Sequence, residues 1–266
     1  MEMTATIMFR NKLNAFCRGR LLHIYKYFGL TATNILNGHE ITFDPNTDIG
    51  GALFFNGWFE RGEIEISRKY IKEDSNILDI GANIGVHSIC YASFASRGRV
   101  FSFEPAPQTF FKLYNNVKNV RNILPMNIGI SDSKCVVPFF IASDDAYSGL
   151  QDTKREKIVA VRDVLCWKVD DFLSGLDLKS LDFVKIDVEG FELNVFNGML
   201  QTIKQFKPVI FCEIYRGKAS NHAPEIITEL LMNMGYDVYV SNGTELIKWS
   251  HHDDKLYNYF FLPQGR

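Results

Sequence analysis

The fold is decided by the stretch Asn76-Ile77-Leu78-Asp79-Ile80-Gly81-Ala82-Asn83-Ile84-Gly85. In it a short apolar run ends in an acid, and a loop with a glycine at each end leads into a helical pattern. This order predicts a strand that turns tightly into a helix. Because Gly81 and Gly85 have no Cβ, the backbone can turn sharply there and let a ligand approach closely.

A second acid, Glu104, stands at the end of the next apolar run, residues 99–103. An acid about 20 residues beyond such a loop binds the ribose hydroxyls in nucleotide-binding α/β folds. The loop is not the G-x-G-x-x-G of dinucleotide folds, because Asn83 stands where the close-approach glycine would be. Asp79 would also repel a pyrophosphate. An acid at that position suits the cationic end of S-adenosyl-L-methionine, so the pattern predicts this cofactor. The alternative is a plain glycine turn.

Strand and helix patterns alternate through the middle of the chain. After the loop they predict a helix, a strand, a helix and a strand over residues 86–94, 99–103, 105–120 and 123–128. This alternation predicts an α/β fold with a Rossmann-like, doubly wound and mostly parallel sheet, joined by right-handed crossovers. Ligands of such sheets bind beyond the carboxyl ends of the strands. Asp79, the glycine loop and Glu104 all fall at that edge.

A third informative stretch is Leu181-Asp182-Phe183-Val184-Lys185-Ile186-Asp187-Val188-Glu189-Gly190. It predicts a buried strand that ends in two alternate acids, Asp187 and Glu189, with Lys185 able to balance one charge. Carboxylates beside a cofactor can accept a proton, hold a metal ion or orient a substrate. The alternative is a capping box for the next helix, which is predicted over residues 191–206.

The C-terminal part of the chain predicts one more parallel strand, residues 208–215, in which Glu213 stands near the end. His222 lies just beyond it as a candidate general base, although a solvated loop histidine is the commoner case. The cluster His251-His252-Asp253-Asp254 lacks a defined ligand spacing and is interpreted as a turn. A helix and a closing antiparallel hairpin with an Asn242-Gly243 turn are predicted over residues 223–234, 236–240, 245–249 and 257–262.

Three regions organise the rest of the chain. Residues 1–50 are interpreted as an N-terminal helical and hairpin extension, and residues 51–266 as the catalytic domain. Residues 131–170 interrupt the alternation with two added strands, 136–141 and 158–161, and substrate choice is expected in this insertion. Glu60 stands a helix length before the cofactor strand. It either reaches the mouth of the cofactor site or is an exposed acid at a helix N-terminus.

Composition excludes several classes of protein. A net charge of −2 over 266 residues gives no basic groove for nucleic acid. Five cysteines without a C-x-x-C pair favour free thiols in a reducing compartment. No apolar run approaches the ~20 residues of a membrane span and no signal peptide is visible, so a cytoplasmic location is expected. The basic and amphipathic residues 1–30 either lie weakly on an anionic membrane surface or pack on the domain.

Together these motifs resemble the FkbM family of class I S-adenosylmethionine-dependent methyltransferases. The motif at residues 78–85 is shared by many methyltransferases, whereas the run that begins at Lys185 is far more family-specific. Order and spacing hold from about residue 50 onward. The matching motifs are Gly57-Trp58-Phe59-Glu60, Leu78-Asp79-Ile80-Gly81-Ala82-Asn83-Ile84-Gly85, Phe103-Glu104-Pro105, Lys185-Ile186-Asp187-Val188-Glu189-Gly190-Phe191-Glu192-Leu193 and Lys207-Pro208-Val209-Ile210-Phe211-Cys212-Glu213.

The resemblance implies a seven-stranded sheet whose last strand is antiparallel. It places Glu104 on the ribose hydroxyls, the glycine loop against the methionine moiety, and the backbone from Asn127 to Ile130 beside the adenine. Family members are similar to sugar and macrolide O-methyltransferases, so the expected acceptor is a hydroxyl of a sugar, glycan or natural product. The Asn/Asp-Pro-Pro-Tyr/Phe run of nucleobase amino methylation is absent, which argues against nucleic acid. The candidate cofactor-binding residues are Glu60, Asp79, Gly81, Asn83, Gly85, Glu104 and Asn127.

Methylation of an alcohol needs its oxygen in line with the methyl group and a group that takes the proton. Asp187 is the first candidate base, followed by Glu189, Glu213 and His222. A divalent ion on Asp187 that lowers the pKa of the alcohol is the alternative. Two rival interpretations are a nucleotide-dependent oxidoreductase and a non-catalytic binding module. The presence of both Asp79 and Glu104 argues against the second.

Overall fold

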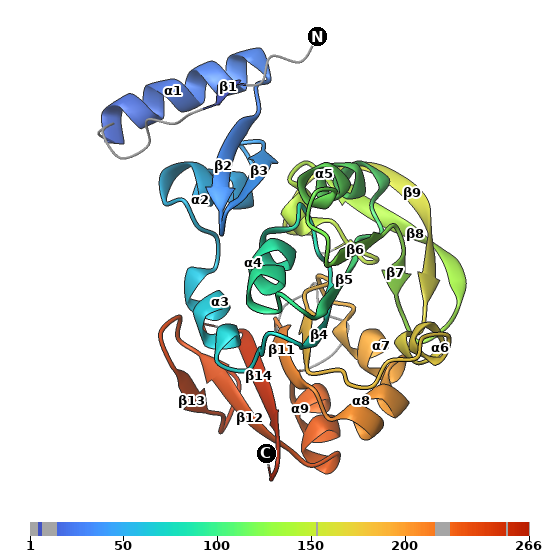
Figure 1. Ribbon diagram of the computed structural model, residues 1–266. Coiled ribbons are helices and arrows are strands. Elements are labelled where there is room, and N and C mark those ends of the chain that lie inside the picture. Colours follow the sequence, from blue (N-terminus) through green and yellow to red (C-terminus); the bar gives the residue numbers. More distant parts are fainter. Residues whose placement is uncertain (1–4, 7–14, 153, 216–223, 254, 266) are drawn as a thin grey trace.

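The computed structural model describes residues 5–6, 15–152, 154–215, 224–253 and 255–265 (Figure 1). Its centre is an eight-stranded sheet with the order β13-β12-β14-β11-β10-β4-β5-β6. Along the chain these strands are β4 (Asn76–Ile80), β5 (Arg99–Phe103), β6 (Ile123–Met126), β10 (Phe183–Ile186), β11 (Val209–Glu213), β12 (Tyr236–Ser241), β13 (Leu246–Lys248) and β14 (Asn258–Pro263).

The sheet is parallel from β6 to β11 and becomes antiparallel at β14. β14 runs antiparallel to both of its neighbours, β11 and β12. β13 is an edge strand that a hairpin joins to β12, with a positive φ at Gly243 in the turn. The predicted Rossmann-like sheet of seven strands with an antiparallel C-terminal strand is therefore confirmed, and β13 adds an eighth strand at its edge.

The order in which the chain adds strands reverses at β4. β5 and β6 lie on one side of β4, and the chain then returns to place β10 and β11 on the other side. In doubly wound sheets, ligands bind in the crevice at the carboxyl ends of the strands where this reversal occurs. The ends of β4, β5 and β10 are therefore the place to look for a site.

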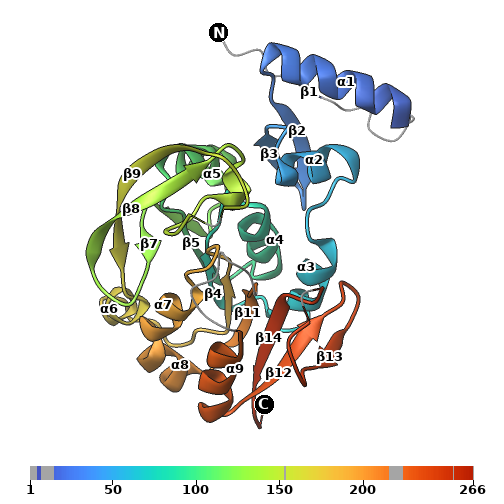
Figure 2. The ribbon, with the colours of Figure 1, turned by 180° about the vertical axis from the view of Figure 1, so that it is seen from behind.

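Helices cover both faces of this sheet (Figures 1 and 2). Alternate strand residues point to opposite faces, so Ile77 belongs to one hydrophobic core and Leu78 to the other. Because both faces are buried, the parallel strands have nearly continuous apolar sequences. The first core is covered by α3 (Arg61–Arg68), α4 (Val86–Phe94) and α5 (Pro107–Val117), and the second by α6 (Val169–Ser174), α7 (Glu192–Asn197), α8 (Leu200–Phe206) and α9 (Pro224–Asn233).

The prediction of a single helix over residues 191–206 is wrong, because the structure has two helices there, α7 and α8. The break lies at Gly198, where a Cβ would be 2.0 Å from the carbonyl oxygen of Ser131. Asp170 then caps the second helix, because its carboxylate accepts hydrogen bonds from the backbone N–H groups of Gln201 and Thr202. Contacts distant in sequence thus divide a segment whose local pattern is helical throughout.

The insertion forms a small sheet of its own, which includes the two added strands that the sequence predicts. β7 (Gly129–Ile130), β8 (Cys135–Ala142) and β9 (Ile158–Trp167) pair in the order β7-β9-β8. The second added strand is longer than predicted. The strand predicted over residues 123–128 ends at Met126, because the chain leaves the main sheet there to form β7. The cysteines whose side chains are described are free thiols, as predicted: Cys90, Cys135, Cys166 and Cys212.

The segments before the main sheet pack on its first core. The β2–β3 hairpin turns at Asn37-Gly38, where both residues have positive φ as the sequence predicts. Ile41 and Phe43 of this hairpin are buried with α4 and α5, and Tyr25 meets Phe54 edge-to-face at 5.5 Å. The elements are β1 (Ala5–Thr6), α1 (Ala15–Phe28), β2 (Ala32–Leu36), β3 (His39–Phe43) and α2 (Asp48–Phe55).

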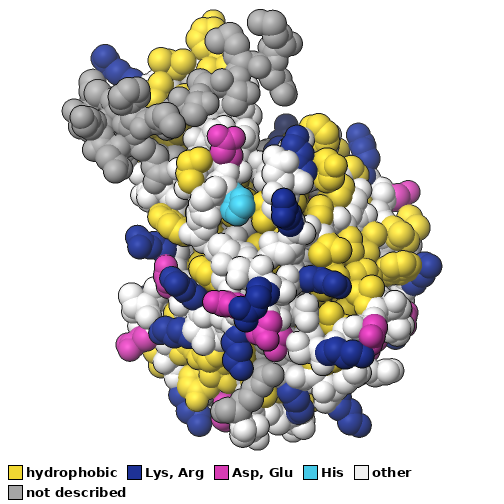
Figure 3. All heavy atoms as spheres, in the orientation of Figure 1, with side chains coloured by type: hydrophobic (Ala, Val, Ile, Leu, Met, Phe, Trp, Pro, Cys, Tyr) yellow, Lys and Arg dark blue, Asp and Glu magenta, His cyan; other side chains and the backbone are white. Residues whose placement is uncertain are grey.

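Two surfaces expose apolar side chains. Figure 3 shows hydrophobic side chains gathered over the part of the molecule where β8 and β9 lie, and Val136 and Val159 are among the exposed ones. The other surface is on α1, which lies at the far end of the molecule from β12 (Figure 1). It exposes Ile24, Tyr27 and Phe28, with Tyr27 as much as 83% exposed. Within the described residues, no helix has both the length and the apolar character needed to cross a membrane.

A close approach between α3 and the turn after β12 allows a test of the packing in this fold. A Cβ on Gly62 would lie 1.9 Å from the carbonyl oxygen of Gly243, in the β12–β13 turn. We expect Gly62→Ala to lower the free energy of unfolding by about 1–3 kcal/mol, because the clash exceeds the gain of about 1 kcal/mol in helix propensity. Urea unfolding measures the change. The matched control is Gly51→Ala in α2, where the nearest atom is 3.6 Å away and stability should be kept or slightly raised. Equal effects of the two changes would contradict the proposed clash.

Candidate active site

The glycine loop continues from β4 and is held by the ends of β5 and β10. Gly81 N donates to Phe103 O at 3.0 Å. Gly81 has a φ of 79°, and a Cβ on it would lie 1.7 Å from the carbonyl oxygen of Asp187. Gly81 is therefore required by the close approach of two strand ends, which is a packing reason in addition to ligand access. Gly85, with a φ of 97°, begins α4 and turns the chain into that helix.

Glu104 follows β5 and lines a cavity together with the loop. Its carboxylate accepts hydrogen bonds from Asn83 N at 3.0 Å and from Ala106 N at 2.9 Å. Burial raises the pKa of Glu104 to about 7, although these two N–H groups act in the opposite direction. A hydrogen bond thus links the glycine loop to Glu104, as the sequence pattern requires, and the buried carboxylate of Glu104 lies at the cavity.

Asp79 lies beneath the loop and is fully buried. The Ser88 hydroxyl donates to one of its carboxylate oxygens at 2.5 Å. The other oxygen has no hydrogen bond and lies 3.9 Å from Lys185 Nζ. Burial raises the pKa of Asp79, and Lys185 and Ser88 oppose that shift. A direct contact between Asp79 and the cofactor stays a prediction, since the contacts of this carboxylate are with Ser88 and Lys185.

Lys185 is a buried cation at the point where strand order reverses. It pairs in register with Asp79 across β10 and β4. Its ammonium donates to Gly81 O at 3.0 Å and to Asp187 Oδ2 at 3.1 Å. Burial alone would lower the pKa of Lys185, but Asp187, Asp79 and Glu60 outweigh burial and raise it. The charged side chain therefore joins the loop to the acidic end of β10.

The three candidate bases Asp187, Glu189 and Glu213 meet beyond the ends of β10 and β11. One carboxylate oxygen from each lies within 4.8 Å of the other two, an arrangement that can hold a metal ion. Burial, reinforced by Asp187, raises the pKa of Glu189 to about 8. The same causes raise the pKa of Glu213 well above its ordinary value. His222, the fourth candidate, lies outside the described residues.

Glu189 does not act as a helix cap. Its carboxylate pairs with Arg155 Nη1 at 2.8 Å, and its backbone has a φ of 53°. The N–H of Gly190 is bonded by Glu192 instead. The acidic run therefore does not form a capping box, since the N-cap residue of α7 is Phe191 without a side-chain cap, and the functional role of its carboxylates stays a prediction.

Glu60 reaches the same region from the start of α3. Its side chain is only 16% exposed, and Oε2 lies 3.3 Å from Nε2 of His87. Burial lowers the pKa of His87 well below its ordinary value, so His87 is neutral and the contact is not an ion pair. Burial, followed by the charge of Asp187, raises the pKa of Glu60 to about 8. The interpretation of Glu60 as an exposed helix-terminal acid is therefore wrong.

Asn127 holds the segment after β5. Its side-chain amide donates to the carbonyl oxygens of Glu104 and Pro105, at 2.9 and 3.0 Å. The next residues, Ile128 to Ile130, line the cavity. Asn127 therefore supports the position of Glu104, and contact between Asn127 itself and a cofactor stays a prediction.

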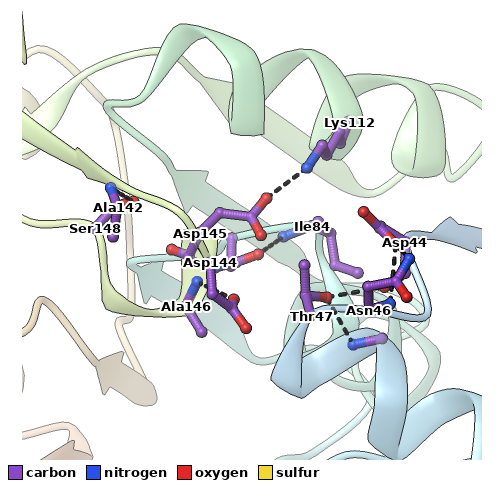
Figure 4. Close-up of polar contacts among 12 residues, drawn as sticks. Asp44, Asn46, Thr47, Ile84, Lys112, Ala142, Asp144, Asp145, Ala146 and Ser148 are labelled. Atoms are coloured by element: carbon purple, nitrogen blue, oxygen red, sulfur yellow. Dashed lines mark hydrogen bonds and ion pairs between the residues drawn. The ribbon is translucent and has the colours of Figure 1, made fainter. Parts of the chain in front are cut away.

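The insertion covers this cavity, and Asp145, Ser148 and Gly149 are among the residues that line it. Lys112, on α5, reaches down to pair with Asp145 at 2.6 Å (Figure 4). Asn83 Nδ2 donates to the carbonyl oxygen of Asp145 at 3.3 Å. The insertion is thus tied to both the glycine loop and α5, on the ligand side of the sheet as the sequence predicts.

The sequence patterns do not identify Arg155 as part of this site. Its guanidinium lies 4.4 Å from the centroid of the Tyr147 ring and 4.6 Å from that of Tyr215. Tyr215 in turn stacks on Tyr257 at 4.4 Å. An arginine in a polar loop has the pattern of a solvated residue, so only the folded insertion shows that Arg155 faces the acids.

The sheet order, the glycine loop and the acids at the strand ends define a class I methyltransferase fold. The chain belongs to the FkbM methyltransferase domain family, which it matches over residues 79–238. The predicted family and enzyme class, a methyltransferase, are confirmed, and the oxidoreductase alternative is wrong.

Individual proteins similar to the chain include two named methyltransferases. The hexuronic acid methyltransferase AglP of Haloferax volcanii is 30% identical over 173 residues, which are 64% of this chain and 69% of AglP. The 2-O-methyltransferase NoeI of Sinorhizobium fredii is 25% identical over 146 residues, 50% of this chain and 60% of NoeI. The crystal structure of a methyltransferase FkbM from Methylobacillus flagellatus is 13% identical, covers 97% of this chain and 73% of its own, and has a TM-score of 0.48.

Removal of the buried cation gives a pH-dependent prediction. We expect Lys185→Met to lower the free energy of unfolding by about 3–5 kcal/mol at pH 8, because Asp79 and Asp187 are left charged without a partner. At pH 5.5 the loss should be smaller. The pKa of Asp79 is already raised in the folded state and rises further without Lys185. An acid whose pKa is higher in the folded state than in the unfolded state stabilises the folded state at low pH. This contribution is lost as the pH rises through the pKa of the folded state.

Urea unfolding at the two pH values tests this expectation, with Lys204→Met on the exposed side of α8 as the control. An equal loss at both pH values would contradict the account of the charge pair.

Proposed function

We propose that this protein transfers a methyl group from S-adenosyl-L-methionine to a hydroxyl of a sugar or glycan. The observation that carries the proposal is the placement of the buried Glu104 carboxylate and the three-carboxylate group at one edge of the sheet. The names of two relatives, a hexuronic acid methyltransferase and a 2-O-methyltransferase, support a sugar as the acceptor. A natural-product hydroxyl is the alternative acceptor. In this proposal residues 51–266 are the catalytic unit, 131–170 its acceptor-side insertion, and 1–50 an extension.

The residues present fit this cofactor. Glu104 offers carboxylate oxygens at the cavity for ribose hydroxyls, and the loop from Gly81 to Gly85 lies beside it for the methionine moiety. The backbone from Ile128 to Ile130 lines the cavity and suits the adenine. Among the described residues, the charged side chains that line the cavity are the acids Glu104, Asp145, Asp187 and Glu189, which favours a ligand with a positive end. Glu60, Asp79, Asn83 and Asn127 complete the proposed set of cofactor residues.

The chain's own residues have three tasks in this reaction. When bound, S-adenosyl-L-methionine supplies an activated methyl group on a positive sulfur. The insertion excludes water, and the cavity wall holds the acceptor oxygen in line. A carboxylate takes the proton that the hydroxyl loses. We propose Asp187 as the proton acceptor, ahead of Glu189 and Glu213.

Calorimetric titration tests the cofactor, and an assay of methyl transfer tests the base. We expect micromolar binding of S-adenosyl-L-methionine and of its demethylated product, and none of NAD. Glu104→Ala should weaken that binding about 10- to 100-fold, because hydrogen bonds to a charged carboxylate are lost. Asp187→Asn should keep the binding but slow methyl transfer to sugar acceptors by about 100-fold or more.

The control for Glu104 is Glu73→Ala, which removes an exposed acid paired with Arg97. Failure of the wild-type protein to bind S-adenosyl-L-methionine would overturn the proposed function. Full activity of Asp187→Asn would overturn only the assignment of the base.

We also propose that α1 contacts an anionic membrane surface, where a lipid-linked sugar would be found. Exposed Ile24, Tyr27 and Phe28 lie beside Lys26 on this helix, a combination that favours the membrane interface. Tyr27→Ser combined with Phe28→Ser should lower cosedimentation with phosphatidylserine vesicles several-fold. The same changes at the exposed Phe111 and Tyr114 of α5 should not. Equal binding of the two double variants would exclude this role of α1.

A further inference from the structure

Four side chains form a stacked row next to the three carboxylates: Tyr147, Arg155, Tyr215 and Tyr257. The guanidinium of Arg155 lies 4.4 Å from the Tyr147 ring centroid and 4.6 Å from that of Tyr215, and Tyr215 stacks on Tyr257. Tyr147 and Arg155 come from the insertion, whereas Tyr215 and Tyr257 flank β11 and β14. The hydroxyl of Tyr147 is also bonded to Asp48. The row therefore joins the insertion to the main sheet at the acidic end of the site.

Arg155 is held in place but retains unused hydrogen-bonding capacity. Two aromatic rings lie against it, which limits the orientations of its planar head. Within the described residues its hydrogen bond is from Nη1 to Glu189 Oε2, at 2.8 Å. A guanidinium has five N–H donors in a planar fork that matches the two oxygens of a carboxylate. The side chain is 33% exposed, so a ligand can reach the remaining donors.

The charges around the row determine which ligands the site tolerates. Asp187, Glu189 and Glu213 are close together and offer no positive charge to an anion. Two cations of the described residues lie beside them, Lys185 and Arg155. Lys185 is 2% exposed and already bonded to Gly81 and Asp187, whereas the side chain of Arg155 is 33% exposed. In the part of the chain that the structure describes, Arg155 is therefore the cation that an acidic acceptor can reach.

We propose that Arg155 selects an acceptor sugar that carries a carboxylate, by exchanging Glu189 for the carboxylate of the sugar. This inference rests on the proposed function and names the class of its acceptor, an acidic sugar such as a hexuronic acid. The exchange is balanced in charge, since one carboxylate replaces another on the guanidinium.

Paired sugars test the inference without the need for turnover. Methyl glucuronide carries a carboxylate where methyl glucoside carries a hydroxymethyl group. Calorimetry at neutral pH gives the affinity of the protein for each sugar. We expect the wild-type protein to bind the glucuronide at least about 10-fold more tightly, as a charge-assisted pair would give. In Arg155→Gln the two affinities should agree within about 2-fold. Arg155→Lys should keep part of the preference for the glucuronide, because the positive charge remains but the planar pair of guanidinium donors is lost.

The matched control is Arg162→Gln on β9, where the guanidinium bonds the carbonyl oxygen of Val161. This change should leave the preference intact, and thermal unfolding of each variant checks that the fold is kept. If Arg155→Gln still prefers the glucuronide as the wild-type protein does, the inference is overturned, because another residue would then recognise the sugar carboxylate.

Two further outcomes would also overturn the inference. A wild-type protein that binds the glucoside as well as the glucuronide, and methylates it, would leave the proposed function standing without Arg155 as its selector. Binding of neither sugar would remove the acidic acceptor. Titration with S-adenosyl-L-methionine, which does not involve Arg155, would then decide separately whether methyl transfer is retained.

Discussion

The buried ammonium of Lys185 holds the carboxyl edge of the sheet together. Lys185 donates to Gly81 O and to Asp187, and lies beside Asp79 on the neighbouring strand. Taking one charge out of water costs several kcal/mol, and removing one partner of a buried pair leaves the other uncompensated. Asp79 and Lys185 are therefore tolerated in the interior because they lie together. Since the ammonium also fixes the start of the glycine loop, the position of Glu104 depends indirectly on the same contact.

The remaining acids give the edge its chemistry. Glu60 and Glu189 have pKa values raised to about 8, and Glu104 to about 7, chiefly by burial. Near neutral pH these carboxyl groups are partly protonated, so they can bind or release a proton in that range. A plain glycine turn between strand and helix requires no such property. The insertion lines the cavity at this edge and brings a partly exposed cation, Arg155, to the acids.

The sequence predicts those parts of the site that follow from topology. Parallel strands bring their carboxyl ends to one edge, so Glu104, Asp187 and Glu213 could be placed together before any coordinates were known. The break at Gly198 could not, because the backbone of Ser131, distant in sequence, imposes it. Arg155 could not either, since its position depends on how the insertion folds. The local sequence pattern also did not show how deeply Asp79 is buried or which way the Glu60 side chain points, because tertiary packing sets both.

The place of β14 in the sheet affects how the chain becomes a folded protein. β14 is the last described strand in the chain, yet it lies between β11 and β12 and pairs with both. During synthesis β11 and β12 leave the ribosome first and cannot lie side by side in their final positions. Glu213, in register with Asn258, stays at an open sheet edge until β14 arrives. The edge of β11 that carries Glu213 is thus covered only after residues 258–263 have been made, and an exposed edge before that point is an opportunity for aggregation.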